Sequence, residues 1–172
     1  VYHPYDLETG APQTAEVVSD KIEAHYAKIE VIADDADLSD NSMNRLEKAH
    51  RVFKGMIHTI AFFWSFVAQH IASIGLTPEM ESIMRDILIP AFYLQSASKK
   101  AAKAKERHRL AKLSKELLAR LELIEGWGML AESIKDQMKN IAIDCANVFQ
   151  RSSSCVEGRN GYLSLRHHGS HQ

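Results

Sequence analysis

The residues between Arg151 and Asn160 are the ones whose types and spacing could do chemistry rather than packing. Three consecutive serines precede Glu157, and Arg159 and Asn160 follow it. Serines directly before a glutamate can cap a new helix and place its carboxylate in the first turn, where the helix dipole keeps it ionised. A divalent metal ion needs such an ionised, oriented ligand, so we expect Glu157 to be a metal ligand. The alternative is an ordinary helix start on a solvated surface.

A dense basic run in the middle of the chain forms a second candidate site. Its members are Lys99, Lys100, Lys103, Lys105, Arg107, Arg109, Lys112 and Lys115. On one continuous helix this spacing would spread the cations around most of the circumference, where they could hold a DNA backbone without reading bases. No interleaved aromatics and no helix-turn-helix pattern accompany them. The alternative is a solvated helix face, or a face that docks against the acidic first helix.

The nine histidines of the chain offer a possible metal site of another kind. His167, His168 and His171 lie close together, but a glycine stands among them and no His-Glu-x-x-His motif is present. His58 and His70 belong to an apolar stretch, where we expect core histidines with hydrogen-bond partners. No zinc site is therefore predicted.

The charge of the chain is balanced overall but unevenly distributed. The 172 residues are 25% charged and 45% hydrophobic, with a formal net charge of −1. Residues 1–50 carry 11 Asp/Glu against 4 Lys/Arg, whereas residues 99–120 carry 9 Lys/Arg against 2 Asp/Glu. This apolar content supports a folded domain and excludes wholesale disorder. The near-neutral total does not exclude DNA as a partner for one face.

Several features indicate a cytoplasmic protein. Cys145 and Cys155 are too few for a disulfide scaffold, and the first residues do not resemble a signal peptide. Residues 56–76 are long and apolar enough to suggest a membrane span, but they include two histidines and several other polar residues. We therefore expect a buried core helix here, no membrane partner and no small-molecule substrate.

Apolar residues recur at helical spacing over most of the chain, and no stretch shows sustained strand alternation. After an extended entry segment, the pattern predicts a first helix from Thr14 and a second from about residue 40 to Gly75. A third helix begins at Thr77, which is followed directly by a proline in the first turn. Pro90 should kink or end this helix near Ile89.

Two further helices are expected beyond residue 100. The first carries a coiled-coil-like seam with spacings of 3, 4, 4 and 3, formed by Leu110, Leu113, Leu117, Leu121 and Ile124. The second begins at about Met129. We therefore predict an all-α chain, an antiparallel bundle of about four to six helices with no substantial β-sheet. Its parts are an entry segment (1–12), a helical bundle (13–148) and a Ser/Arg/Gly loop with the start of a last helix (149–172).

The segment from Phe149 to Gly161 resembles the closing motif of DDE-type transposases. In that motif a lead-in rich in Ser, Thr or Asn precedes a glutamate, a basic residue and an asparagine. The segment from Tyr2 to Gly10 is also similar to part of a bacterial transposase-like family. The resemblance implies a ribonuclease-H-like core with two aspartates on strands and an all-helical insertion before the last carboxylate. Residues 13–148 would then match the insertion, and Glu157 the final carboxylate.

The chemistry that this resemblance implies is metal-dependent phosphoryl transfer on DNA, with two divalent ions (Mg or Mn) held by three carboxylates. Arg151, Arg159 and Asn160 would contact phosphates beside Glu157, and the basic run from Lys99 to Lys112 would contact the DNA backbone.

No pair of partner aspartates can be placed in this chain. We therefore expect a fragment of a longer parent, inactive alone and without a cofactor of its own. The alternative is a non-enzymatic helical module that interacts or oligomerises through the seam from Leu110 to Ile124.

Overall fold

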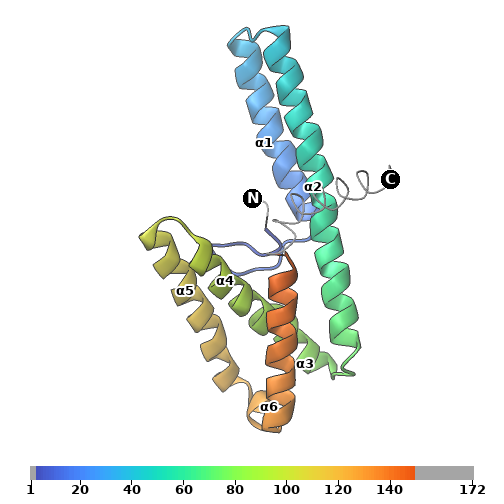
Figure 1. The fold of residues 1–172 in the computed structure, drawn as a ribbon, viewed down its shortest axis with the longest axis vertical. Helices are drawn as coiled ribbons and strands as arrows, with labels where there is room; N and C mark the ends of the chain where they lie inside the picture. The colour runs from blue at the N-terminus through green and yellow to red at the C-terminus, as the bar shows by residue number, and fades with distance from the viewer. Residues whose placement is uncertain (1–2, 150–172) are drawn as a thin grey trace, which may run out of the picture.

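The computed structural model describes residues 3–149, which form helices joined by short connections (Figure 1). The elements are α1 (Ala15–Asp35), α2 (Asp40–Ala72), α3 (Pro78–Ile83), a π-helical turn (Met84–Leu88), α4 (Ile89–Lys100), α5 (Ala104–Ala119), a 3-10 turn (Arg120–Leu123) and α6 (Glu125–Gly128). Residues 132–149 are also helical. Within the described range there is no β-strand, only one isolated bridge between Tyr5 and Pro12. The predicted all-α class is confirmed.

Local sequence signals set the helix ends. Thr14 and Thr77 each accept a hydrogen bond from the backbone amide three residues ahead, so they cap α1 and α3 as predicted. Asp37, with φ of 48°, turns the chain between α1 and α2. Gly75 follows α2 with φ of 67°, a left-handed conformation that favours glycine.

Pro90 does not end the third helix, because the backbone stays helical through α3 and α4. A proline inside a helix lacks the N–H donor, and its ring collides with the carbonyl four residues earlier. The π-helical turn immediately before it widens the backbone at that place and accommodates the ring. Of the two predicted outcomes near Ile89, a kink or a helix end, the structure shows an irregular turn and no end.

The helices form a long hairpin and a bundle (Figure 1). α1 runs antiparallel along the first half of α2, and this hairpin projects away from the other helices. The second half of α2 buries Ile60, Phe63, Val67 and Ile71 in the core of the bundle. This half contains most of the apolar stretch 56–76, which runs four residues past the end of α2. Among the described residues, no helix has the length and apolar character needed to cross a membrane.

The leucine seam of α5 faces the inside of the bundle. Leu110, Leu117 and Leu121 are buried, and α5 packs along α4. The Ser114 hydroxyl donates a hydrogen bond of 2.8 Å to the Ala91 carbonyl at this contact. The seam is therefore occupied by the chain itself, which corrects the prediction that it pairs with a partner helix or a second copy.

The entry segment runs past the junction of hairpin and bundle (Figure 1), and the side chain of its Tyr5 is fully buried. The Tyr5 ring lies 6.0 Å from that of Phe63, 5.4 Å from that of Trp64 and 5.5 Å from that of Tyr93. The Trp64 indole N–H also donates to the backbone carbonyl of Gln13, at 2.8 Å. The segment is thus part of the core, although its sequence carries no regular pattern.

The Tyr5 hydroxyl is buried with no hydrogen-bond partner among the described residues, and burial raises its pKa well above the ordinary value. Because such a group costs roughly 1–3 kcal/mol, we expect Tyr5→Phe to raise the free energy of unfolding by about 1 kcal/mol in urea melts. Tyr93→Phe is the matched control. It removes a 2.6 Å hydrogen bond to His3 and should lower the free energy of unfolding by about 1 kcal/mol. A loss for Tyr5→Phe as large as that for Tyr93→Phe would contradict this account.

Candidate nucleic-acid interface

The basic run does not lie on one helix. Lys99 and Lys100 end α4, Ala101 is extended, and α5 begins at Ala104 with Lys103 as its N-cap residue. The expectation of cations spread around a single continuous helix is therefore wrong. The break at 101–103 gathers them at the corner where α4 meets α5 (Figure 1).

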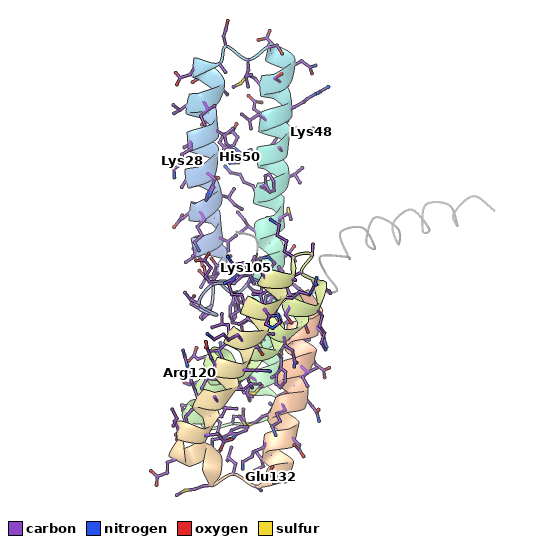
Figure 2. The ribbon with its side chains drawn as sticks, turned by 90° about the vertical axis from the view of Figure 1, so that its left-hand side faces the viewer. Lys28, Lys48, His50, Lys105, Arg120 and Glu132 are labelled. Carbon is purple, nitrogen blue, oxygen red and sulfur yellow. The ribbon has the colours of Figure 1, made fainter. Side chains whose placement is uncertain are left out.

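Four lysines at this corner are exposed, and we call them the basic corner: Lys99, Lys100, Lys103 and Lys105. Within the described part of the chain, no salt bridge involves Lys99, Lys103 or Lys105. Figure 2 shows Lys105 at the beginning of α5. Positive charges collected in this way raise the local potential and attract polyanions such as a nucleic-acid backbone.

Two other cations of the run interact with nearby groups. The Arg107 guanidinium donates hydrogen bonds of 3.0 and 2.9 Å to the carbonyls of Ala101 and Ala102, so it satisfies backbone acceptors where α4 ends. Lys112 lies 3.7 Å from the Glu116 carboxylate, one turn along α5. Both cations are exposed, and each already interacts with a neighbouring group of the protein.

Arg109 has a structural role at this interface. Its guanidinium donates a 2.9 Å hydrogen bond to the Leu7 carbonyl and pairs with the Glu106 carboxylate. The hydrogen bond to Glu106 raises the pKa of Arg109, and the nearby charges of Glu8 and Asp6 add to this effect. Arg109 thus ties α5 to the entry segment, and its contact with DNA stays a prediction.

The acidic first helix does not cover the basic run. Its Glu23 carboxylate instead interacts with His50 and Lys54 of α2, both at 3.1 Å. Across the described residues, no salt bridge joins α1 to residues 99–115. The basic run therefore does not dock against the acidic first helix.

The candidate metal and phosphate ligands near the end of the chain lie outside the described residues. They are Glu157, Arg151, Arg159 and Asn160, together with His167, His168 and His171. Within residues 3–149, no three His, Cys, Asp or Glu side chains lie close enough to hold a metal ion.

Three other residues singled out from the sequence are in the described range. Burial raises the pKa of the Cys145 thiol to about 12, which makes it a poor nucleophile. His70 is half-buried, and its Nδ1 lies 3.0 Å from the Phe66 carbonyl, as expected for a core histidine. His58 is exposed, so its assignment to the core is wrong, because α2 turns that side toward solvent.

Residues 84–172, slightly more than half of the chain, match the model of a family of unknown function, DUF6399. The chain belongs to this family. The DUF6399 region begins at the π-helical turn and includes the basic corner, whereas α1 and α2 precede it. No curated protein and no solved structure matches the chain. Family membership therefore assigns no activity to these helices.

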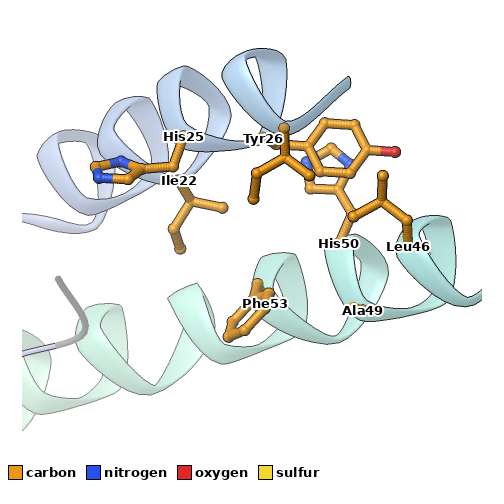
Figure 3. Close-up of a pocket in the computed structure, with 8 residues that line it drawn as sticks. Ile22, His25, Tyr26, Leu46, Ala49, His50 and Phe53 are labelled. Carbon is orange, nitrogen blue, oxygen red and sulfur yellow. The ribbon is translucent and has the colours of Figure 1, made fainter. Parts of the chain in front are cut away.

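Sequence reasoning missed a groove between the two helices of the hairpin. It has a volume of about 270 Å³ and is lined by Ile22, His25, Tyr26, Ile29, Leu46, Ala49, His50 and Phe53 (Figure 3). The apolar members of this set have the spacing of core residues, yet the side chains of Ile29 and Phe53 remain 46% and 48% exposed. The available signal was the number of apolar residues on each helix, which exceeds what two helices can bury against one another.

A comparison of Arg109 with Lys105 tests which cations of the run stabilise the fold and which only face solvent. We expect Arg109→Gln to lower the free energy of unfolding by about 1 kcal/mol, because the bond to the entry segment is lost at a partly exposed site. The matched control Lys105→Gln should change it by less than about 0.5 kcal/mol. Urea melts followed by circular dichroism measure both. Equal effects of the two substitutions would refute the assignment.

Proposed function

We propose that this DUF6399 chain is the helical, DNA-contacting part of a cytoplasmic DDE-type transposase-like protein, with the basic corner on the phosphate backbone. The observation that carries the DNA contact is the gathering of four exposed lysines where α4 meets α5. Contacts of this kind position a protein on DNA and carry no sequence information. We therefore propose binding that depends on charge rather than on base sequence.

Two of these lysines do not stabilise the beginning of α5. Lys103 is the N-cap residue and makes no capping hydrogen bond, and Lys105 lies in the first turn. Cations there meet the positive end of the helix dipole, whereas Ser, Thr, Asp or Asn would satisfy free backbone amides. A phosphate group at this position would interact favourably with both the lysines and the helix end. The arrangement therefore favours an anionic ligand.

The DNA contact predicts a defined dependence of affinity on salt. Because each neutralised phosphate contributes a slope of about −0.9, four lysines should give a log–log slope of about −3 to −4. Fluorescence anisotropy with a labelled duplex of about 30 base pairs should show affinity falling about 100-fold between about 50 and 200 mM NaCl.

Two double variants with the same change in net charge test whether the corner is responsible. Lys99→Gln with Lys105→Gln should make the slope shallower by about 2 and weaken binding at low salt. Lys28→Gln with Lys48→Gln, in the hairpin, should leave both values close to wild type. Equal effects of the two double variants, or binding that ignores salt, would refute the proposal.

The transposase part of the proposal rests on the resemblance of the segment from Phe149 to Gly161. In a longer parent protein, Glu157 would be the last of three carboxylates, and Arg151, Arg159 and Asn160 would contact phosphates. Bound Mg or Mn would supply activation of a water molecule or a DNA 3′-hydroxyl. No pair of partner aspartates can be placed from the sequence, so the proposal takes the other two carboxylates from further parts of that parent.

The proposed role of Glu157 is tested in a protein that includes the flanking reading frame. We expect Glu157→Gln to abolish Mg²⁺-dependent strand cleavage, because the amide cannot replace an ionised metal ligand. Duplex binding should stay within about twofold of wild type, since the basic corner is unchanged. Retained cleavage would remove Glu157 from the catalytic set without affecting the DNA contact.

A further inference from the structure

We infer that the groove between α1 and α2 binds an amphipathic helix with acidic flanks. The groove uses none of the lysines of the basic corner, and the hairpin precedes the DUF6399 region. The inference is therefore independent of the proposed DNA contact.

One side of the hairpin is closed by its own polar contacts. The ring of Tyr26 stacks on that of His50, with centroids 3.6 Å apart and an interplanar angle of 12° (Figure 3). The His50 Nε2 lies 3.1 Å from both carboxylate oxygens of Glu23, and the Lys54 ammonium lies 3.1 Å from the same carboxylate. These four side chains join α1 to α2 on this side with polar and stacking contacts.

The other side of the hairpin is open and apolar. His25 and Ala49 line the groove there, and residues three or four positions away on the same helix share that face. Large apolar side chains follow along both helices, with exposed fractions of 46% for Ile29, 64% for Ile32, 58% for Val52 and 48% for Phe53. Contiguous exposed apolar surface of this kind marks an interaction site. A third helix laid along this side would cover both rows.

The charges beside the groove decide which helix fits. Lys21 and Lys28 lie on the turns before and after His25, and Arg45 lies one turn before Ala49, so all three flank the open side. Lys21 also interacts with the entry segment through Gln13 and Asp6. Lys28 and Arg45 are exposed and form no salt bridge among the described residues.

Acidic residues are few on this flank, where spacing places only Asp35, near the tip of the hairpin. Three of the hairpin's carboxylates belong to the closed side, namely Glu23, Glu30 and Glu47. A second copy presenting the same open face would bring like charges together, which disfavours self-association. A partner helix with Asp and Glu beside its apolar row would instead be complementary in charge.

The bound state we propose is a three-helix bundle. The partner would place apolar side chains at i, i+3 or i+4, and i+7 into the groove, in the manner of helix-in-groove recognition. Its acidic residues would lie opposite Lys28 and Arg45. Burial of apolar side chains in the groove thus supplies the affinity for the partner helix. Lys28 and Arg45 determine the orientation of that helix and the selectivity for acidic flanks.

Two designed peptides of about 18 residues test the charge selectivity of the groove. Both carry leucines in an i, i+3, i+4, i+7 row, but one has glutamates and the other lysines on the flanks. Measured by anisotropy with the whole chain, the acidic peptide should bind with a micromolar Kd and the basic peptide at least about tenfold more weakly. Equal binding of the two peptides, or no saturable binding of the acidic one, would overturn the inference.

Matched charge reversals then locate the binding. Lys28→Glu with Arg45→Glu should weaken binding of the acidic peptide at least about tenfold. Lys48→Glu with Arg51→Glu reverses two cations away from the groove and should change it less than about twofold; Figure 2 shows Lys48 on the side of α2 away from α1. Similar losses in both double variants would mean that binding is only a response to net charge.

Two further measurements separate the groove from other sites. Ile32→Ser, at an exposed position, should weaken peptide binding about fivefold without changing the thermal melt. Lys99→Gln with Lys105→Gln should bind the peptide as wild type does, even if it loses DNA. If sedimentation shows a wild-type dimer that Ile32→Ser dissociates, the occupant is a second copy and the acidic-helix proposal is wrong.

Discussion

The burial of Tyr5 between α2 and α4 is the contact on which the rest of the structure depends. Its ring lies beside that of Trp64, in the half of α2 that packs in the bundle, and beside that of Tyr93 in α4, so one side chain joins these two helices. The entry segment that carries it is held at two further points, by Trp64 at Gln13 and by Arg109 at Leu7. This short irregular segment therefore links α2, α4 and α5 to one another.

Folding divides the charges of the chain into two kinds. Some satisfy backbone carbonyls or close gaps between elements, as Arg107, Arg109 and Glu23 do. Others, including Lys103 and Arg45, are exposed and form no salt bridge within the described range. Both proposals rest on exposed cations, because exposed positive charges raise the local potential that an anionic ligand meets.

Most helix ends could be predicted from the sequence, because capping is local. Thr14 and Thr77 cap the beginnings of α1 and α3, and Gly75 follows the end of α2 with a positive φ, as their positions in the sequence predict. Each acts on the backbone only a few residues away. The break at Ala101 was missed, since a run of alanines and lysines has high helix propensity and no Gly or Pro. The break places the lysines at the basic corner instead of along one helix. The residues of the candidate site were therefore predicted from the sequence, but their arrangement in space was not.

The sequence by itself determined the helical class, most helix boundaries and which residues are apolar, because those properties depend on spacing and on neighbours in the chain. Only the tertiary structure decided which apolar faces meet. Leu117 and Ile32 both have helical apolar spacing, but Leu117 is 2% exposed against the bundle and Ile32 is 64% exposed on the hairpin. The physical reason is that burial requires a partner surface from elsewhere in the chain, and α5 has α4 beside it whereas the open side of the hairpin has no described helix to cover it.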